Sequence, residues 1–199
     1  MAVATTDKVL AEVIGAGEGP ALRVKQAALV VLGIVALAAA AQIKVPMWPV
    51  AINMGTFAVL TIGAAYGPRL GLVTILGYMG IGAMGFDVFQ SSTAQLNGID
   101  YMMGGTGGYL LGYVLATMLL GMAARGGWDR TPGWMALAML AGNLLLYIPG
   151  LLWLGQVYGW DKPILQWGLT PFIIGDALKL ALAAMILPGV WKLVGRARG

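Results

Sequence analysis

The chain has 199 residues, of which 59% are hydrophobic and 10% charged, and its formal net charge is +4. A soluble domain carries about 45–50% apolar and about 25% charged residues, so the composition excludes an ordinary soluble fold and predicts an integral membrane protein. The absence of Cys and His excludes disulfides, haem, iron–sulfur clusters, the usual zinc sites and Ser-His-Asp or Cys-His catalysis. We therefore expect no metal site and no catalytic residue.

The apolar runs predict an all-α fold, a compact bundle of six transmembrane helices. Residues 1–25 are polar or mildly amphipathic and are expected to form a cytoplasmic arm, in which Gly15–Pro20 ends a short surface helix. Residues 26–199 then form the membrane domain. A spanning helix needs about 20 mostly apolar residues, and the candidate spans are at about 26–43, 50–66, 70–86, 108–124, 134–154 and 171–191. Val88–Ile99 is too polar and interrupted to span.

Basic residues are distributed unevenly between the two sides of this bundle. Six spans place both termini on one side, and that side carries nine Lys or Arg residues: Lys8, Arg23, Lys25, Arg69, Arg125, Arg130, Lys192, Arg196 and Arg198. The other side carries Lys44 and Lys162. Because cytoplasmic connections are enriched in basic residues, we expect both termini in the cytoplasm. The +4 charge is explained by this placement and does not indicate nucleic-acid binding.

The two long connections, Asp87–Gly107 and Gly155–Thr170, then face outward. Long loops on one face of a small bundle are typical of a lid over a binding site. The first connection contains neutral hydrogen-bonding side chains, which suit a small polar ligand: Gln90, Ser91, Ser92, Thr93, Gln95, Asn97, Tyr101 and Thr106. The alternative is a solvated loop without a ligand.

Glycines and alanines spaced four residues apart predict close helix packing. Gly104, Gly108 and Gly112 share one helix face, and small faces let helix backbones approach. The stretch GGTGGY, which contains the first two, also opens the fourth span, where backbone N–H groups can hold a carboxylate or a carbonyl. Ala36 and Ala40 share a face of the first span, which can pack inside the bundle or meet another protein.

The fifth span contains Asn143 and Tyr147 on one helix face, with Trp153 further along. One interpretation is a ligand wall, in which the aromatic rings supply an apolar surface and Asn143 supplies a donor and an acceptor. The other is an interhelical hydrogen bond together with an interfacial aromatic belt.

The sixth span contains Asp176 and Lys179 within an otherwise apolar run. Ionisable groups at that depth are costly and are generally functional. Residues three apart share a helix face, so both side chains should point into the bundle interior or a wet cavity. We favour a ligand site, where Asp176 accepts from ligand N–H groups and Lys179 donates to a carbonyl or carboxylate. The alternative is an ion pair that fixes helix packing. In either case the two side chains should lie close together when no ligand is bound.

Four stretches together resemble one known family. They are Gly104–Ala116 (GGTGGYLLGYVLA), Ile173–Ala183 (IIGDALKLALA), Ala65–Gly85 and Gln42–Gly67. In this order, and with six spans, they resemble the BioY family, the biotin-specific substrate-binding subunits (S components) of energy-coupling factor transporters. The resemblance covers nearly the whole chain after about Gln26.

The resemblance implies a vitamin-uptake subunit rather than an enzyme. Such a protein captures biotin with high affinity in an outward-facing pocket, as a multi-pass protein of the bacterial inner membrane. It works with a transmembrane coupling subunit and two ATP-binding cassette ATPases, which use the ATP, so the chain itself needs no cofactor. In this family the coupling subunit contacts an Ala-xxx-Ala face of the first helix, which Ala36 and Ala40 match.

The resemblance also implies roles for the polar site residues. Asp176 suits the ureido N–H groups of biotin, and Lys179 suits the ureido carbonyl or the carboxylate. Asn97 matches an Asn of the family's third loop and suits either end. The backbone N–H groups of Thr106 and Gly107 suit the carboxylate. Which polar group meets which end of biotin stays open.

The resemblance further implies that Tyr147 and Trp153 form the walls of the site and flank the ring of biotin. This sequence departs from the family pattern at four positions. Gly105 stands where the family has Pro, and Ala51 and Gly55 stand where it has Pro and Gln. Leu110 stands where some members have Arg.

Two alternative functions remain. One is an ion-coupled carrier that works alone with Asp176 as its coupling group, and the other is a structural membrane protein in which Asp176 and Lys179 form a packing pair.

Overall fold

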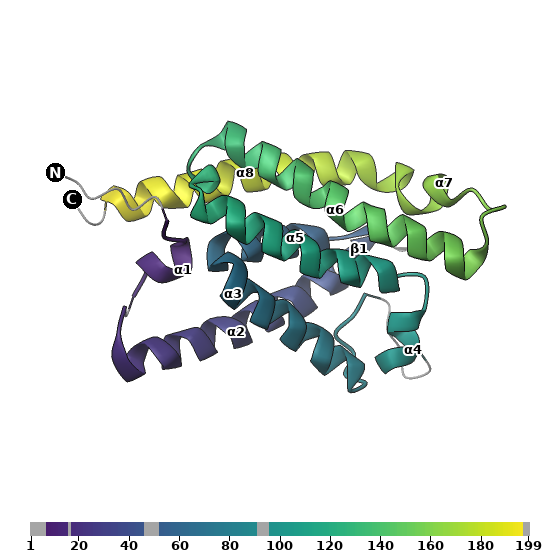
Figure 1. The fold of residues 1–199 in the computed structure, drawn as a ribbon, viewed down its shortest axis with the longest axis horizontal. Helices are drawn as coiled ribbons and strands as arrows, with labels where there is room; N and C mark the ends of the chain where they lie inside the picture. Colours follow the sequence, from purple (N-terminus) through teal and green to yellow (C-terminus); the bar gives the residue numbers. More distant parts are fainter. Residues whose placement is uncertain (1–6, 16, 46–51, 91–95, 197–199) are drawn as a thin grey trace.

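The computed structural model describes residues 7–15, 17–45, 52–90 and 96–196, which form helices and one short hairpin (Figure 1). The elements are α1 (Leu10–Val13), α2 (Gly19–Gln42), β1 (Lys44–Val45), β2 (Ile52–Asn53), α3 (Gly55–Ala83), α4 (Gly98–Met103), α5 (Gly107–Arg125), η1 (Trp128–Arg130), α6 (Pro132–Tyr158), α7 (Ile164–Gly168), η2 (Thr170–Phe172) and α8 (Ile173–Arg196). Within these residues, five stretches are long and apolar enough to cross a membrane: α2, α3, α5, α6 and 164–195. The predicted helical membrane architecture is confirmed.

Helix α3 changes direction at Gly67, where φ is 76° and ψ is 175°. A Cβ placed at Gly71 would lie 3.6 Å from the Gly63 Cα, whereas eight residues of straight helix span about 12 Å. The chain therefore folds back on itself at Gly67–Pro68, and Figure 1 shows the two arms meeting near α1. The predicted second and third spans correspond to these two arms, 55–66 and 68–83.

Two helices are longer than the sequence predicted. α2 begins at Gly19 rather than near residue 26, with Pro20 in its first turn, a position where the missing N–H and fixed φ of proline are favourable. α6 runs from Pro132 to Tyr158, and Pro149 lies inside it without ending it. The expected arm therefore contains α1 and the first turns of α2; residues 1–6 lie outside the described part.

Glycines bring α5 close to the helices on either side of it. On the α3 side, a Cβ at Gly63 would meet the Thr117 carbonyl at 2.9 Å, and one at Gly121 would overlap the backbone of Pro68. On the α6 side, a Cβ at Gly112 would meet Leu146 at 2.6 Å, and one at Gly108 would overlap the backbone of Pro149. Gly108 and Gly112 therefore serve helix packing, as their spacing predicts.

The two ends of the bundle carry different elements (Figure 1). One end holds α1, η1 and the end of α8, and the other holds α4 and α7. At the first end, Arg125 pairs with Glu12 of α1 at 2.5 Å, and Arg130 donates to the Lys8 carbonyl at 3.2 Å. These contacts fix α1 over the reversal in α3, where Val9 lies against Gly67.

Candidate ligand-binding site

A cavity of about 50 Å³ lies among α3, α4, α5, α6 and α8. Its lining is mostly aromatic, with a few polar groups: Ala41, Asn53, Thr56, Tyr78, Phe89, Gln90, Tyr101, Thr106, Tyr109, Leu110, Tyr113, Leu146, Tyr147, Phe172 and Lys179. Small-molecule sites typically have mainly apolar walls and a few placed polar groups, and the cavity has such a lining. Its enclosed space of about 50 Å³ is smaller than the about 300–1,000 Å³ typical of these sites, so a ligand has to displace part of the lining.

The polar part of the cavity is centred on Lys179. Its ammonium donates to Asp176 Oδ1 at 3.0 Å, to Thr56 Oγ1 at 3.0 Å and to the Asn53 carbonyl at 2.6 Å. β2 and the first turn of α3 supply the last two partners, so the β1–β2 hairpin positions this group as much as α8 does. All three ammonium protons are directed at protein acceptors.

Asp176 is 5% exposed and lies behind this ammonium. Besides Lys179, its carboxylate accepts hydrogen bonds from the Tyr147 hydroxyl and from Thr56 Oγ1. A buried carboxylate is tolerated only when its charge is paired and its lone pairs are bonded. The two charged groups lie 3.0 Å apart, as their spacing on one helix face predicts. The pair can offer an N–H acceptor and a donor to a ligand that replaces one of the present partners.

Aromatic rings form the walls. Tyr109 and Tyr147 meet edge to face, with centroids 6.1 Å apart, and Phe172 lies 6.3 Å from Tyr147. The Tyr109 hydroxyl donates to the Gly168 carbonyl at 2.8 Å. Each ring is thus held by α5, α6, α7 or η2 and presents apolar surface toward the cavity.

The connection after α3 closes another side of the cavity, at residues 88–90. Three consecutive carbonyls accept one hydrogen bond each: Val88 from the Tyr78 hydroxyl at 3.0 Å, Phe89 from Gln42 Nε2 at 3.2 Å and Gln90 from the Tyr101 hydroxyl at 2.6 Å. The Phe89 ring stacks on Tyr101 at 5.0 Å. Side chains from α2, α3 and α4 therefore hold this segment in place. Residues 91–95, where Ser91, Ser92, Thr93 and Gln95 were expected in a ligand loop, lie outside the described residues.

The structure brings four of the predicted site residues to the cavity. Lys179, Tyr147 and Thr106 line it, and Asp176 bonds directly to two of these. They come from α8, α6 and the residue before α5. Tertiary packing therefore joins three of the segments that the sequence singled out separately.

The other four predicted residues lie outside the lining. Trp153 Nε1 donates to the Gly104 carbonyl at 2.8 Å, and a Cβ at Gly107 would lie 2.9 Å from the same nitrogen. Trp153 and the glycine turn thus pack against each other. Asn97 precedes α4 as its N-cap residue. Asn143 is buried on α6, and its Oδ1 has no partner among the described residues.

Several cavity residues were not selected from the sequence. Tyr109 and Tyr113 are four apart on α5 and line the cavity together, so their helical spacing was an available signal. Asn53 and Thr56 act through a carbonyl and a hydroxyl beside Lys179, and no sequence pattern distinguishes them.

The face of α2 around Ala36 and Ala40 is open. In α2 only Gly33, Leu37 and Ala41 are buried; Ala36 is exposed and Ala40 is half-buried. The α2 face that contains Ala36 is therefore not used for packing by the described residues.

Comparison with known proteins connects this architecture to one family. The sequence model described as "BioY family" matches residues 12–196. The probable biotin transporter BioY of Pyrococcus horikoshii is 34% identical over 165 residues, which cover 83% of this chain and 95% of that protein. The biotin transporter BioY of Thermotoga maritima is 29% identical over 83% of this chain and 91% of that protein. These relatives are named as transporters and not as enzymes.

A solved structure shares the fold. The crystal structure of "the S-component for biotin from an ECF-type ABC transporter" superposes with a TM-score of 0.72, covering 88% of this chain and 95% of that one, at 19% identity. At that identity the likeness describes the fold alone. The family match extends over nearly the whole chain, including the GD-x-x-K segment that supplies Asp176 and Lys179. The chain therefore belongs to the BioY family.

Proposed function

We propose that this chain is the biotin-binding S component of an ECF-type ABC transporter and that biotin binds in the aromatic cavity. The observation that carries the proposal is the buried Asp176–Lys179 pair at the cavity, 3.0 Å between charged atoms. The names of the relatives support the choice of ligand.

The chemistry of biotin matches the two parts of the cavity. Its ureido ring has two N–H donors and one carbonyl, which complement the Asp176 carboxylate and the Lys179 ammonium. The neutral ureido group suits this position because an added carboxylate would face Asp176 and repel it. The apolar faces of the bicyclic ring then lie against Tyr109, Tyr147 and Phe172. The carboxylate extends toward the part of the lining that contains Thr106 and Gln90.

The membrane arrangement follows from the basic residues. α2, the two arms of α3, α5, α6 and α8 make six crossings, with both termini and most Lys and Arg residues in the cytoplasm. α4, α7 and residues 88–90 then face outward, and the cavity receives biotin from that side. The protein is a multi-pass protein of the bacterial inner membrane.

Transport depends on partner subunits. A transmembrane coupling subunit packs on the α2 face that contains Ala36 and Ala40, where small residues allow close approach. Two ATP-binding cassette ATPases supply the energy, and this chain holds no cofactor of its own.

Isothermal titration of the purified full chain with biotin tests the function. We expect saturable one-to-one binding and thermal stabilisation by biotin, with no response to riboflavin or thiamine under the same conditions. The absence of heat and stabilisation at micromolar biotin would contradict the proposal. Equal responses to all three vitamins would also exclude a biotin-specific site.

A further inference from the structure

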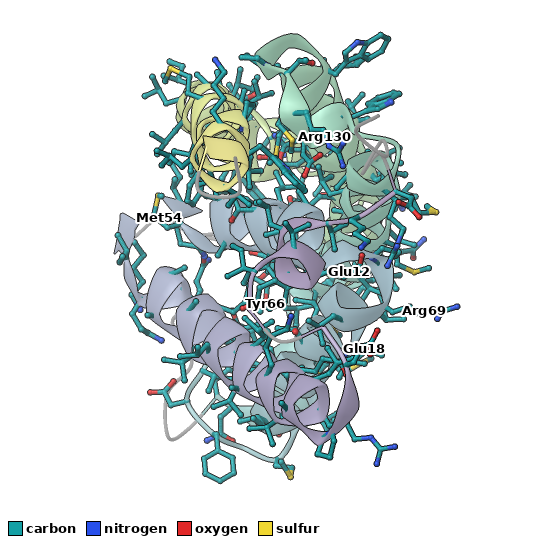
Figure 2. The ribbon with its side chains drawn as sticks, turned by 90° about the vertical axis from the view of Figure 1, so that its left-hand side faces the viewer. Glu12, Glu18, Met54, Tyr66, Arg69 and Arg130 are labelled. Atoms are coloured by element: carbon teal, nitrogen blue, oxygen red, sulfur yellow. The ribbon has the colours of Figure 1, made fainter. Side chains whose placement is uncertain are left out.

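A second cavity lies at the opposite end of the bundle, between α1, α2, α3 and α5. Its volume is about 310 Å³. Three basic side chains and one acidic one reach it: Lys25, Arg69, Arg125 and Glu12. Figure 2 looks onto this end and shows Glu12 on the short N-terminal helix and Arg69 at the outer edge of the bundle.

The three basic side chains of this cavity differ in how many hydrogen bonds and ion pairs they make. Arg125 is paired with Glu12 at 2.5 Å and also donates to the Asp7 carbonyl at 3.1 Å. Lys25 donates one hydrogen bond, to the Ile14 carbonyl at 2.9 Å, which leaves two ammonium protons. Arg69 makes no hydrogen bond or ion pair with any residue that the structure describes. The cavity therefore has an excess of positive charge and an unused guanidinium, a group suited to bidentate binding of phosphate.

The rest of the lining is apolar and continues onto the outer surface of the helices. Leu29, Leu70 and Val73 contribute to it, and Val73 is 56% exposed. α2 is long enough and apolar enough to cross a membrane, and the second arm of α3 packs beside it, so the exposed apolar side chains here are placed to meet acyl chains. A basic group beside an apolar groove at a membrane boundary matches the two halves of a phospholipid.

We propose that this cavity binds the phosphate headgroup of an anionic glycerophospholipid, with Arg69 and the free protons of Lys25 on the phosphate and an acyl chain along Leu29, Leu70 and Val73. The bound lipid occupies the space between α1 and α2 and joins the N-terminal helix to the membrane domain. The site is separate from the aromatic cavity and does not depend on the ligand bound there.

Native mass spectrometry of the full chain, purified in detergent, tests the site. Phosphatidylglycerol and phosphatidylcholine with identical acyl chains are titrated onto the wild type, Arg69→Gln and Arg23→Gln. Arg23 is an exposed arginine of α2 outside the lining, so its variant controls for total charge. We expect the wild type to bind phosphatidylglycerol more tightly than phosphatidylcholine. In Arg69→Gln the ratio of the two affinities should fall by about five-fold, whereas in Arg23→Gln it should stay unchanged.

Three results would overturn the proposal. The first is equal binding of the two lipids to the wild type, and the second is an equal effect of the two substitutions. The third concerns the source of the phosphate: displacement of phosphatidylglycerol by inorganic phosphate at equal concentration would assign the site to a soluble anion. Because Arg69 is on the surface, its substitution should leave thermal stability without added lipid unchanged.

Discussion

The Lys179 ammonium and the Asp176 carboxylate lie 3.0 Å apart, one helical turn from each other on α8. Neither is free, because Thr56 bonds to both and Tyr147 bonds to the carboxylate. The polar floor of the cavity is therefore a connected hydrogen-bond network in which both charged groups have more than one partner.

Asp176→Asn should weaken biotin binding by at least about 1.5 kcal/mol, or more than ten-fold in Kd, because hydrogen bonds to a charged group contribute on that scale. Isothermal titration measures the change. Asp129→Asn is the matched control, since Asp129 is also buried but lies at the other end of the bundle. Unchanged affinity in Asp176→Asn would return the pair to a packing role. The melting temperature without biotin shows whether the variant folds.

Tyr147→Phe should weaken biotin binding by about 1 kcal/mol, because it removes the hydroxyl that orients the carboxylate and keeps the ring. Tyr66→Phe is the control, because its hydroxyl bonds to the Leu29 carbonyl outside the aromatic cavity. Both affinities are measured by titration. If both variants lose affinity equally, the effect comes from general destabilisation and not from the cavity.

Gly67→Ala should destabilise the folded protein by about 1–3 kcal/mol, because the combination of φ 76° and ψ 175° is essentially restricted to glycine. The added methyl would also lie 3.1 Å from Val9. Gly80→Ala is the contrasting variant: no atom lies within 4 Å of its added Cβ, and it should be neutral or stabilising as a helix substitution. Melting temperatures in detergent compare the two. A neutral Gly67→Ala would show that the reversal in α3 does not require glycine.

We expect the stability of the fold to depend on pH through Asp129, which lies at the end of the bundle that carries α1. Burial raises the pKa of its carboxyl above the ordinary value of 3.8, although the Trp191 hydrogen bond and Arg130 oppose the shift. The folded state then holds the proton at pH values where the unfolded state has released it, so stability falls as pH rises above about 4. Asp129→Asn should remove this fall, because the amide oxygen still accepts from Trp191 and carries no charge.

The measurement is the melting temperature of wild type and variant between pH 4 and pH 7. The difference should grow in favour of Asp129→Asn as pH rises. Asp161→Asn is the control without a trend in this range: the hydrogen bond from Lys162 lowers the pKa of that exposed carboxyl, so its contribution changes below about pH 4 and stays constant from pH 4 to pH 7. A constant difference across the range would contradict the assignment to Asp129.

Much of the fold was predictable from composition and spacing. An apolar run must form a helix in lipid, since every backbone group has to be bonded within the chain, so the helical elements followed from hydropathy. The reversal between the second and third spans lies at Gly67–Pro68, where the sequence predicts a short connection at Gly67–Arg69. The positive φ by which Gly67 makes this turn was not predicted. Hydropathy records the apolar residues on both sides of that glycine but not a single φ angle.

The sequence by itself determined the class of protein, the family resemblance and the importance of Asp176 and Lys179, because ionisable side chains inside an apolar run have few explanations. Only the tertiary structure decided which other groups join them. It placed Thr56 and the Asn53 carbonyl on Lys179, turned Tyr109 and Tyr113 into the cavity, and packed Trp153 against the glycine turn at Gly107. These outcomes depend on how closely helices distant in the chain approach, which is a property of packing that local patterns do not record.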